Sequence, residues 1–177
     1  MNKVLTIPVN LYRKYPVFFF VFTVAILILL FYLTYRNPWF ESHIFTPLVN
    51  IYAWLSGKVL MMFGYDVSIY GDIISSSGFS VSVKKGCDAA EPMAIFVAGI
   101  LAFPALISRK LVGLGIGLGI LFVLNIIRII TLYLTGIHNP DFFESMHLAV
   151  WQVAFIAAAV LLWFLWLRSL IRQPVKK

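Results

Sequence analysis

The chain has 177 residues, of which 62% are hydrophobic and 12% charged, with a mean hydropathy of +0.95. A soluble domain contains about 45–50% apolar and about 25% charged residues, so this composition argues against a soluble enzyme, a disordered tail or a nucleic-acid-binding domain and predicts an integral membrane protein. The net charge of +7 then reports orientation in the membrane rather than a polyanionic partner. A single cysteine, Cys87, rules out an intramolecular disulfide and a multi-cysteine metal site.

Four apolar stretches predict transmembrane helices, because a helix needs about 20 apolar residues to cross a hydrocarbon core about 30 Å thick. They comprise residues 17–35, 90–107, 111–135 and 147–167. No small-residue cleavage site follows the first stretch, which is typical of an uncleaved signal anchor. In the third stretch, four glycines predict close helix packing, with Gly115 and Gly119 forming one small-xxx-small pair; they are Gly113, Gly115, Gly117 and Gly119.

Basic residues outside these stretches predict how the chain is oriented. The positive-inside rule places the N-terminal segment, the turn before residue 111 and the C-terminal tail in the cytoplasm. The residues that carry this prediction are Lys3, Arg13, Lys14, Arg109, Lys110, Arg168, Arg172, Lys176 and Lys177. The segment before residue 90 and the loop 136–146 then lie outside.

A fifth apolar stretch, 44–64, fits this orientation only if it does not cross the membrane once. Its polar residues Thr46, Asn50, Gly57 and Lys58 lie together on one face of a helix. We therefore expect an amphipathic or re-entrant helix in the outer leaflet. The alternative is a full span in which Lys58 reaches the interface and the N-terminus lies outside.

Residues 65–85 differ from the apolar stretches around them. Apolar and polar residues alternate in two runs, 67–69 and 79–83, and the sequence Ser-Ser-Ser-Gly separates the runs. Alternation with period two around such a turn predicts a β-hairpin. The expected fold is one integral membrane domain, 1–177, of the all-α polytopic class, with this small hairpin on the outer face.

Cys87 lies between the predicted hairpin and the second span, in the sequence KKGCDAAEP. Asp88 is placed to cap the following helix, and Pro92 to occupy its first turn. The positive end of the helix dipole and the two lysines before the cysteine would favour the thiolate. Both a nucleophile and an ordinary small residue at an interface are compatible with this position.

Arg128 lies in the outer half of the third span, about 12 Å from its outer end. A permanent cation at that depth costs at least about 2.5 kcal/mol, and such residues are normally functional or paired. Asn125 lies on the same helical face. Either Arg128 serves a function, or a buried carboxylate such as Glu91 or Asp88 holds it in a structural role.

His147 begins the last span from the outside, with Trp151 and Gln152 about one turn further along. His43 and His138 are equal candidates by residue type, and His138 stays open as the acid/base. Placement favours His147, which can meet Cys87 and Arg128 in one leaflet. A thiol, a base and a fixed cation suffice for acyl transfer. The three histidines lack the spacing of metal ligands, so we expect neither a metal nor a cofactor.

Three features in this order resemble the exosortase/archaeosortase family, most closely the short exosortase H type: Gly86-Cys87, the sequence Asn125-x-x-Arg128, and His147 at the head of the last span. The resemblance covers about 83–156. It implies a multi-pass cysteine transpeptidase of the bacterial cytoplasmic (inner) membrane, with its active site on the outer, periplasmic face. Family members often have a small polar residue and a glycine after the cysteine, whereas Asp-Ala-Ala follows here.

The resemblance also implies roles for the residues and partners for the protein. Cys87 would be the nucleophile, Arg128 the oxyanion-stabilising or substrate-positioning cation, and His147 the acid/base. Residues expected to bind substrate or support the site are Asn125, Glu91, Asp88, Gln152 and Trp151. Substrates would be exported proteins with a C-terminal motif, a transmembrane helix and a basic cluster, transferred to an unknown acceptor.

Two other functions stay open on the sequence. A non-catalytic membrane assembly or transport subunit would use Arg128 to pair with a partner's intramembrane carboxylate. A lipid-linked cysteine acyltransferase would need both Cys87 and Arg128. Membrane lipids surround the protein in every case, and nucleic acid is not an expected partner.

Overall fold

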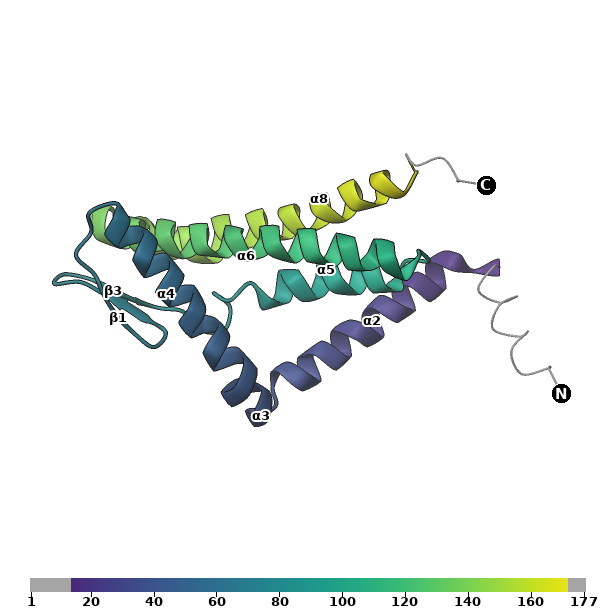
Figure 1. The fold of residues 1–177 in the computed structure, drawn as a ribbon, viewed down its shortest axis with the longest axis horizontal. Helices are drawn as coiled ribbons and strands as arrows, with labels where there is room; N and C mark the ends of the chain where they lie inside the picture. Colours follow the sequence, from purple (N-terminus) through teal and green to yellow (C-terminus); the bar gives the residue numbers. More distant parts are fainter. Residues whose placement is uncertain (1–13, 172–177) are drawn as a thin grey trace.

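The computed structural model describes residues 14–171 (Figure 1). Four of the basic residues used for orientation lie within this range, and the other five lie outside the described residues: Lys3, Arg13, Arg172, Lys176 and Lys177. Four helical segments of the described part are long and apolar enough to cross a membrane: Pro16–Tyr35, Pro38–Met62, Ile107–His138 and Pro140–Ile171. Together with one small sheet, they confirm the predicted all-α polytopic class.

The short helix α5 (Ala90–Ala102) lies at the centre of the bundle, packed against α2 (Pro16–Tyr35), α6 (Ile107–His138) and α8 (Trp151–Ile171). Its 13 residues span about 20 Å, less than the hydrocarbon core of about 30 Å. We predicted a helix to residue 107, but a residue that precedes proline is disfavoured in the helical region, and the chain leaves the helix just before Phe103-Pro104.

Helices α5, α6 and α8 run side by side along the long axis of the molecule (Figure 1). Helix α6 has 32 residues, about 48 Å, and therefore extends well beyond a hydrocarbon core. Before α8 the chain forms the short helix α7 (Pro140–Ser145) and a π-helical turn, η2 (Met146–Val150). The start of α2, the start of α6 and the end of α8 lie at one end of the molecule.

Glycines of α6 let aromatic side chains of neighbouring helices approach its backbone. Gly113 lies against Trp166 of α8, and Gly117 against Phe96 of α5. The predicted close packing is therefore confirmed at these two glycines, but not at the predicted pair Gly115 and Gly119, where nothing lies within 4 Å of a Cβ placed on either. Both are on the exposed side of α6, so the small-residue contact uses the other face of the helix.

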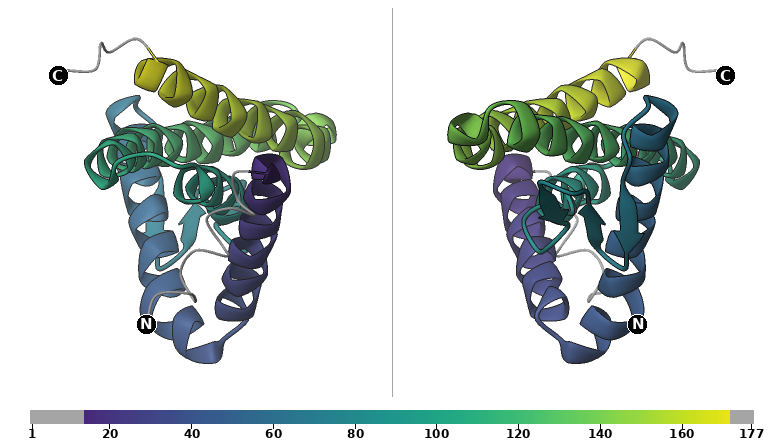
Figure 2. Two further views of the ribbon diagram at one scale, coloured as in Figure 1. Left: turned by 90° about the vertical axis from the view of Figure 1, so that its right-hand side faces the viewer. Right: turned by 90° about the vertical axis from the view of Figure 1, so that its left-hand side faces the viewer.

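The segment Pro38–Met62 consists of α3 (Pro38–Phe40), the π-helical turn η1 (Glu41–Phe45) and α4 (Thr46–Met62). Helices α2 and α4 diverge from α3, with α5 and the sheet between them (Figure 2), and α4 crosses obliquely to pack against α6. By length and composition this segment could cross a membrane. An amphipathic or re-entrant helix at 44–64 stays a prediction.

The segment predicted as a hairpin forms a three-stranded antiparallel meander in the order β1-β2-β3. Its strands are β1 (Ser68–Tyr70), β2 (Ile73–Ser75) and β3 (Ser80–Ser82). The Ser/Gly turn lies where predicted, between β2 and β3, but the hairpin prediction missed β2. Gly71, at φ +59°, begins the additional turn with a backbone conformation that glycine adopts without steric cost.

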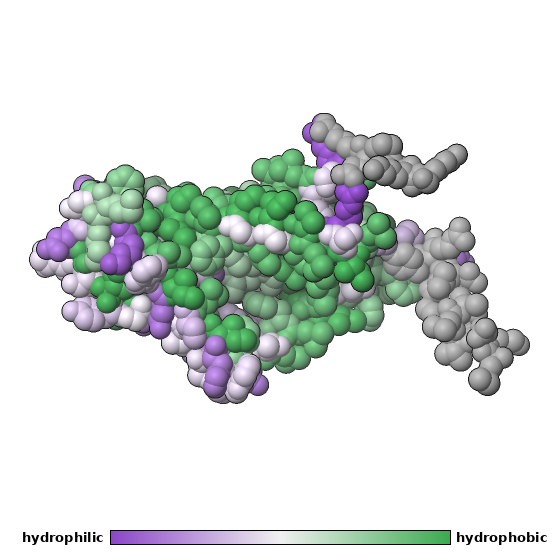
Figure 3. Space-filling view, in the orientation of Figure 1, coloured by the Kyte–Doolittle hydropathy of each residue, from purple (hydrophilic) through white to green (hydrophobic). Residues whose placement is uncertain are grey.

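Polar and apolar residues are segregated over the surface (Figure 3). Apolar residues cover the helical bundle, while hydrophilic residues gather at the end that carries the sheet and around α3. A broad apolar belt between polar ends is the surface that a lipid bilayer stabilises. The described chain is thus organised as a multi-pass membrane protein, with the sheet at the end opposite the start of α2 (Figure 1).

Candidate active site

Cys87 and His147 are in direct contact. The loop between β3 and α5 carries Cys87, the turn η2 carries His147, and the Cys87 Sγ lies 2.9 Å from the His147 Nε2. The thiol is buried, with 7% of the residue exposed. The other two histidines bond within their own helical segments, His43 to Trp39 and His138 to Leu134, so only His147 is within reach of the cysteine.

A tight loop positions the cysteine. The Cys87 backbone N–H donates to the Lys84 carbonyl oxygen at 2.8 Å. Gly86, the residue before Cys87, has a positive φ of +93°. Ala89, the residue before α5, adopts φ +57°, a left-handed conformation that costs a non-glycine residue about 1–2 kcal/mol. The surrounding contacts therefore hold this loop in a defined and locally strained shape.

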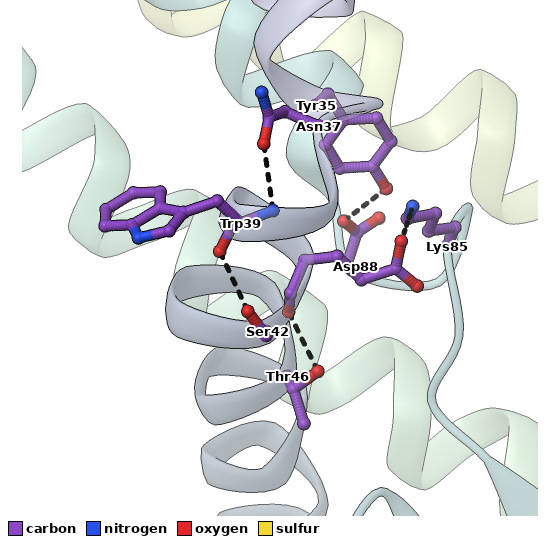
Figure 4. Close-up of polar contacts among 8 residues, drawn as sticks. Tyr35, Asn37, Trp39, Ser42, Thr46, Lys85 and Asp88 are labelled. Atoms are coloured by element: carbon purple, nitrogen blue, oxygen red, sulfur yellow. Dashed lines mark hydrogen bonds and ion pairs between the residues drawn. The ribbon is translucent and has the colours of Figure 1, made fainter.

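Asp88 anchors the loop instead of capping the helix. We predicted an N-cap, but Ala89 occupies that position and no side chain caps α5. The buried Asp88 carboxylate accepts a hydrogen bond from the Tyr35 hydroxyl of α2 at 2.8 Å (Figure 4). It also accepts one from the Gly86 N–H at 3.2 Å. Helix α2 is therefore tied directly to the loop that bears Cys87.

The surroundings of Cys87 do not favour the thiolate as the sequence predicted. Burial raises the pKa of the Cys87 thiol, and the Asp88 carboxylate raises the same pKa, while Arg128 lowers it. The two preceding lysines act elsewhere. Lys84 is exposed, and Lys85 forms an ion pair with Glu41 at 2.9 Å (Figure 4).

Arg128 lies beside the histidine and is almost completely buried, with 2% of the residue exposed. Its Nη2 is 3.4 Å from the His147 carbonyl oxygen, the long end of a hydrogen bond. The guanidinium carbon lies 5.5 Å from the centre of the Phe155 ring, within range of a cation–π interaction. The Arg128 Nε has no hydrogen-bond partner, so the cation retains unused donor capacity.

The structure does not support the alternative in which a carboxylate holds Arg128. Lys85–Glu41 is the only ion pair among residues 14–171. Asp88 bonds to Tyr35, and Glu91 accepts a hydrogen bond from the Tyr32 hydroxyl at 3.1 Å. Asp88 is near enough to attract Arg128 electrostatically, but it makes no direct bond to the guanidinium.

The remaining predicted site residues take different positions. Asn125, one turn from Arg128, is fully buried. The Trp151 Nε1 is also buried without a partner. Gln152 and Glu91 line a cavity of about 90 Å³ between α2, α5 and α8.

Two tyrosines that were not among the predicted site residues lie against two residues that were. The Tyr35 hydroxyl donates to Asp88, and Tyr52 of α4 is fully buried beside Asn125. Both lie in apolar stretches of the sequence, where a tyrosine is indistinguishable from an interfacial anchor. Only the fold shows that they face the core.

The arrangement fits nucleophilic chemistry at sulfur. A base within hydrogen-bond distance of a thiol can take its proton, and a buried guanidinium with free donor capacity can stabilise charge on a carbonyl oxygen. Among residues 14–171, no group of three histidine, cysteine or acidic side chains is placed to hold a metal ion.

Comparison with protein-family models matches residues 16–164 to the model described as Transmembrane exosortase (Exosortase_EpsH). The match runs from α2 into α8 and includes Cys87, Arg128 and His147. No curated protein and no solved structure matches the chain.

Proposed function

Because this chain belongs to the transmembrane exosortase family, we propose that it is a cysteine transpeptidase that cleaves the C-terminal sorting signals of exported proteins. The observation that carries the proposal is the 2.9 Å contact between the Cys87 Sγ and the His147 Nε2, beside the buried Arg128. The proposed enzyme resides in the bacterial inner membrane with this site on the periplasmic side, and it transfers the cleaved protein to an acceptor.

In the proposed reaction, His147 takes the proton of the Cys87 thiol while the sulfur attacks the scissile carbonyl carbon. Arg128 stabilises the negative charge that develops on the carbonyl oxygen. The C–N bond breaks, His147 returns the proton to the leaving amine, and a thioester remains on Cys87. An acceptor amine or water then attacks the thioester and regenerates the thiol.

The raised pKa of Cys87 fits this order of events. A buried thiol is protonated at rest, so it needs a base in contact with it at the moment of attack. His147 is that base, and the imidazolium formed during the reaction is the acid that the leaving amine requires. No oxidant, reductant or metal enters the balance.

The test measures processing in cells that produce an exported protein with a C-terminal sorting signal. Processing is detected as a change in the size of that exported protein. We expect Cys87→Ala to reduce processing by about 10³-fold or more, and Arg128→Lys by about 10²-fold, because lysine keeps the charge but loses the planar fork of donors. His138→Ala, at an exposed histidine outside the site, is the matched control and should process normally. Normal processing by Cys87→Ala would refute the proposal.

The mass of the trapped enzyme separates this function from a lipid-linked acyltransferase. Rapid acid quenching during turnover should leave a peptide thioester on Cys87, measurable as an increase in intact mass. A lipid-derived mass on the same residue would contradict peptide transfer. A non-catalytic subunit would carry neither adduct.

A further inference from the structure

The strand that leads to the nucleophile is an edge strand. In the sheet order β1-β2-β3, strand β3 (Ser80–Ser82) pairs only with β2. Two residues after β3, the Lys84 carbonyl accepts a hydrogen bond from the Cys87 N–H. The free edge of β3 therefore continues through one turn into the loop that holds the reactive sulfur.

The hydrogen-bond register shows which backbone groups this edge presents. The Val83 N–H donates to the Asp72 carbonyl, and the Ser76 N–H donates to the Phe79 carbonyl, both at 2.9 Å. In an antiparallel ladder, residues alternate between bonding to one neighbour and facing away from it. Phe79, Val81 and Val83 thus bond toward β2, while Ser80 and Ser82 direct their N–H and C=O groups to the opposite side.

Side chains leave this edge accessible. Ser80 is exposed, and Ser82 is half-buried with its hydroxyl bonded to Asp72. The core-facing side chains of the strand, among them Phe79 against Gly136 of α6, lie on the other face of the sheet. Unpaired edges are sites where extended peptides add as a further strand.

We propose that the edge of β3 binds the substrate's sorting motif in extended form, as a fourth strand, and so delivers the scissile bond to Cys87. This inference rests on the proposed function. The occupant is the polypeptide segment at the cleavage site, because the edge is continuous with the nucleophile loop and a peptide bond must leave helical geometry to be attacked. Backbone pairing supplies affinity, and alternate side chains of the motif meet the surface around β3.

A proline at Ser80 tests the pairing. Ser80→Pro removes an outward N–H and leaves the bonds to β2 intact, because those come from the residues on either side. Its matched control, Ser80→Ala, retains the N–H. We expect Ser80→Pro to process substrate at least about tenfold more slowly than Ser80→Ala, with equal melting temperatures in detergent and equal alkylation of Cys87. Equal processing by the two variants would overturn the inference.

Cross-linking gives a second measurement that does not depend on turnover. In Cys87→Ala, Ser80→Cys introduces a single thiol that is labelled with a maleimide benzophenone and irradiated in the presence of substrate. Ser68→Cys, on the opposite edge strand and also exposed, is the control. The inference predicts a substrate adduct from position 80 and none from position 68.

The outcomes separate the two proposals. Equal adducts from both positions, or an adduct of position 80 with a second enzyme copy alone, would overturn strand addition. If processing depends on Cys87 while Ser80→Pro equals Ser80→Ala, strand addition falls and the transpeptidase function stands. If Cys87→Ala processes normally, the function itself falls.

Discussion

At Cys87, the reactivity of the thiol depends on its neighbours more than on its position at the start of a helix. Burial and Asp88 favour the protonated form, and Arg128 opposes them. The helix-dipole argument from the sequence omitted desolvation, which disfavours the charged form of any buried acid. An inventory of nearby charges therefore predicted the wrong direction for the pKa of this thiol.

The raised pKa predicts how Cys87 responds to pH. The rate of alkylation by iodoacetamide in detergent should increase with pH through a midpoint above about 8.5, the ordinary value for cysteine, because the folded protein retains the proton to higher pH. Cys87 is the only cysteine in the chain, so mass spectrometry reads its modification without interference, and protein unfolded in guanidinium supplies the reference curve. A midpoint below that reference would indicate a preformed thiolate–imidazolium pair and contradict the expectation.

Cys87, Arg128 and His147 could be selected from the sequence because each is a reactive or charged residue at the same predicted depth in an otherwise apolar chain. Their catalytic roles stay predictions. The orientation of Asp88 could not be predicted, since it depends on Tyr35, 53 positions away along the chain. A helix-capping rule considers only residues that are close in sequence. In the structure, Asp88 makes the tertiary contact with Tyr35 instead of the local cap.

At the scale of the elements, a glycine-to-alanine substitution is expected to have different effects on stability on the two faces of α6. Gly117→Ala would place a methyl group into the ring of Phe96, a buried side chain that is 2% exposed. We expect a loss of about 1–3 kcal/mol in stability, measured as a lower melting temperature in detergent. Gly119→Ala, two residues away and facing open space, should leave stability unchanged or slightly higher, because alanine favours helix. Equal effects of both changes would contradict this packing.

A π-helical turn determines where His147 lies. The turn η2 (Met146–Val150) lies between α7 and α8, and its wider winding changes the direction of the side chains relative to a continuous α-helix. The sequence placed His147 at the head of an α-helical span beginning at residue 147. Hydropathy periodicity does not indicate a π-helical turn. The change of direction that brings the His147 side chain to the Cys87 sulfur is therefore visible only in the structure.

Two element boundaries lie at local sequence signals that the prediction did not use. The Phe103-Pro104 sequence ends α5, and the Gly71-Asp72 sequence begins the turn before β2. Both signals were present in the sequence, but the prediction followed the apolar run at the first and the Ser/Gly turn at the second. The family and the helical class, which depend on motifs and on overall hydropathy, were predicted and confirmed.

For the whole molecule, single exposed cysteines in a Cys87→Ala background test the orientation. A membrane-impermeant maleimide should label Ser68→Cys, in the edge strand β1, in spheroplasts. Ser108→Cys, at the start of α6, should react only after the membrane is permeabilised, because the basic residues beside it favour the cytoplasm. All of these positions are exposed. The reverse pattern would contradict the predicted orientation.

Labelling of Ser42→Cys tests whether the segment Pro38–Met62 crosses the membrane. If 44–64 is amphipathic or re-entrant, Ser42→Cys and Ser68→Cys lie on the same side of the membrane and react together from outside. If this segment crosses the bilayer, the two react from opposite sides. Ser42 is exposed near α3, so limited access would not mask the result.

The short length of α5 has a consequence for the depth of the nucleophile loop. With 13 residues between this loop and the turn at its far end, α5 is about 10 Å shorter than the hydrocarbon thickness that its neighbours cross. Because α5 packs against α2, α6 and α8, these longer helices surround it over the missing length. If the far end of α5 lies at the cytoplasmic boundary of the hydrocarbon core, the nucleophile loop lies about 10 Å inside the opposite boundary, and a substrate helix must present its peptide bond at that depth.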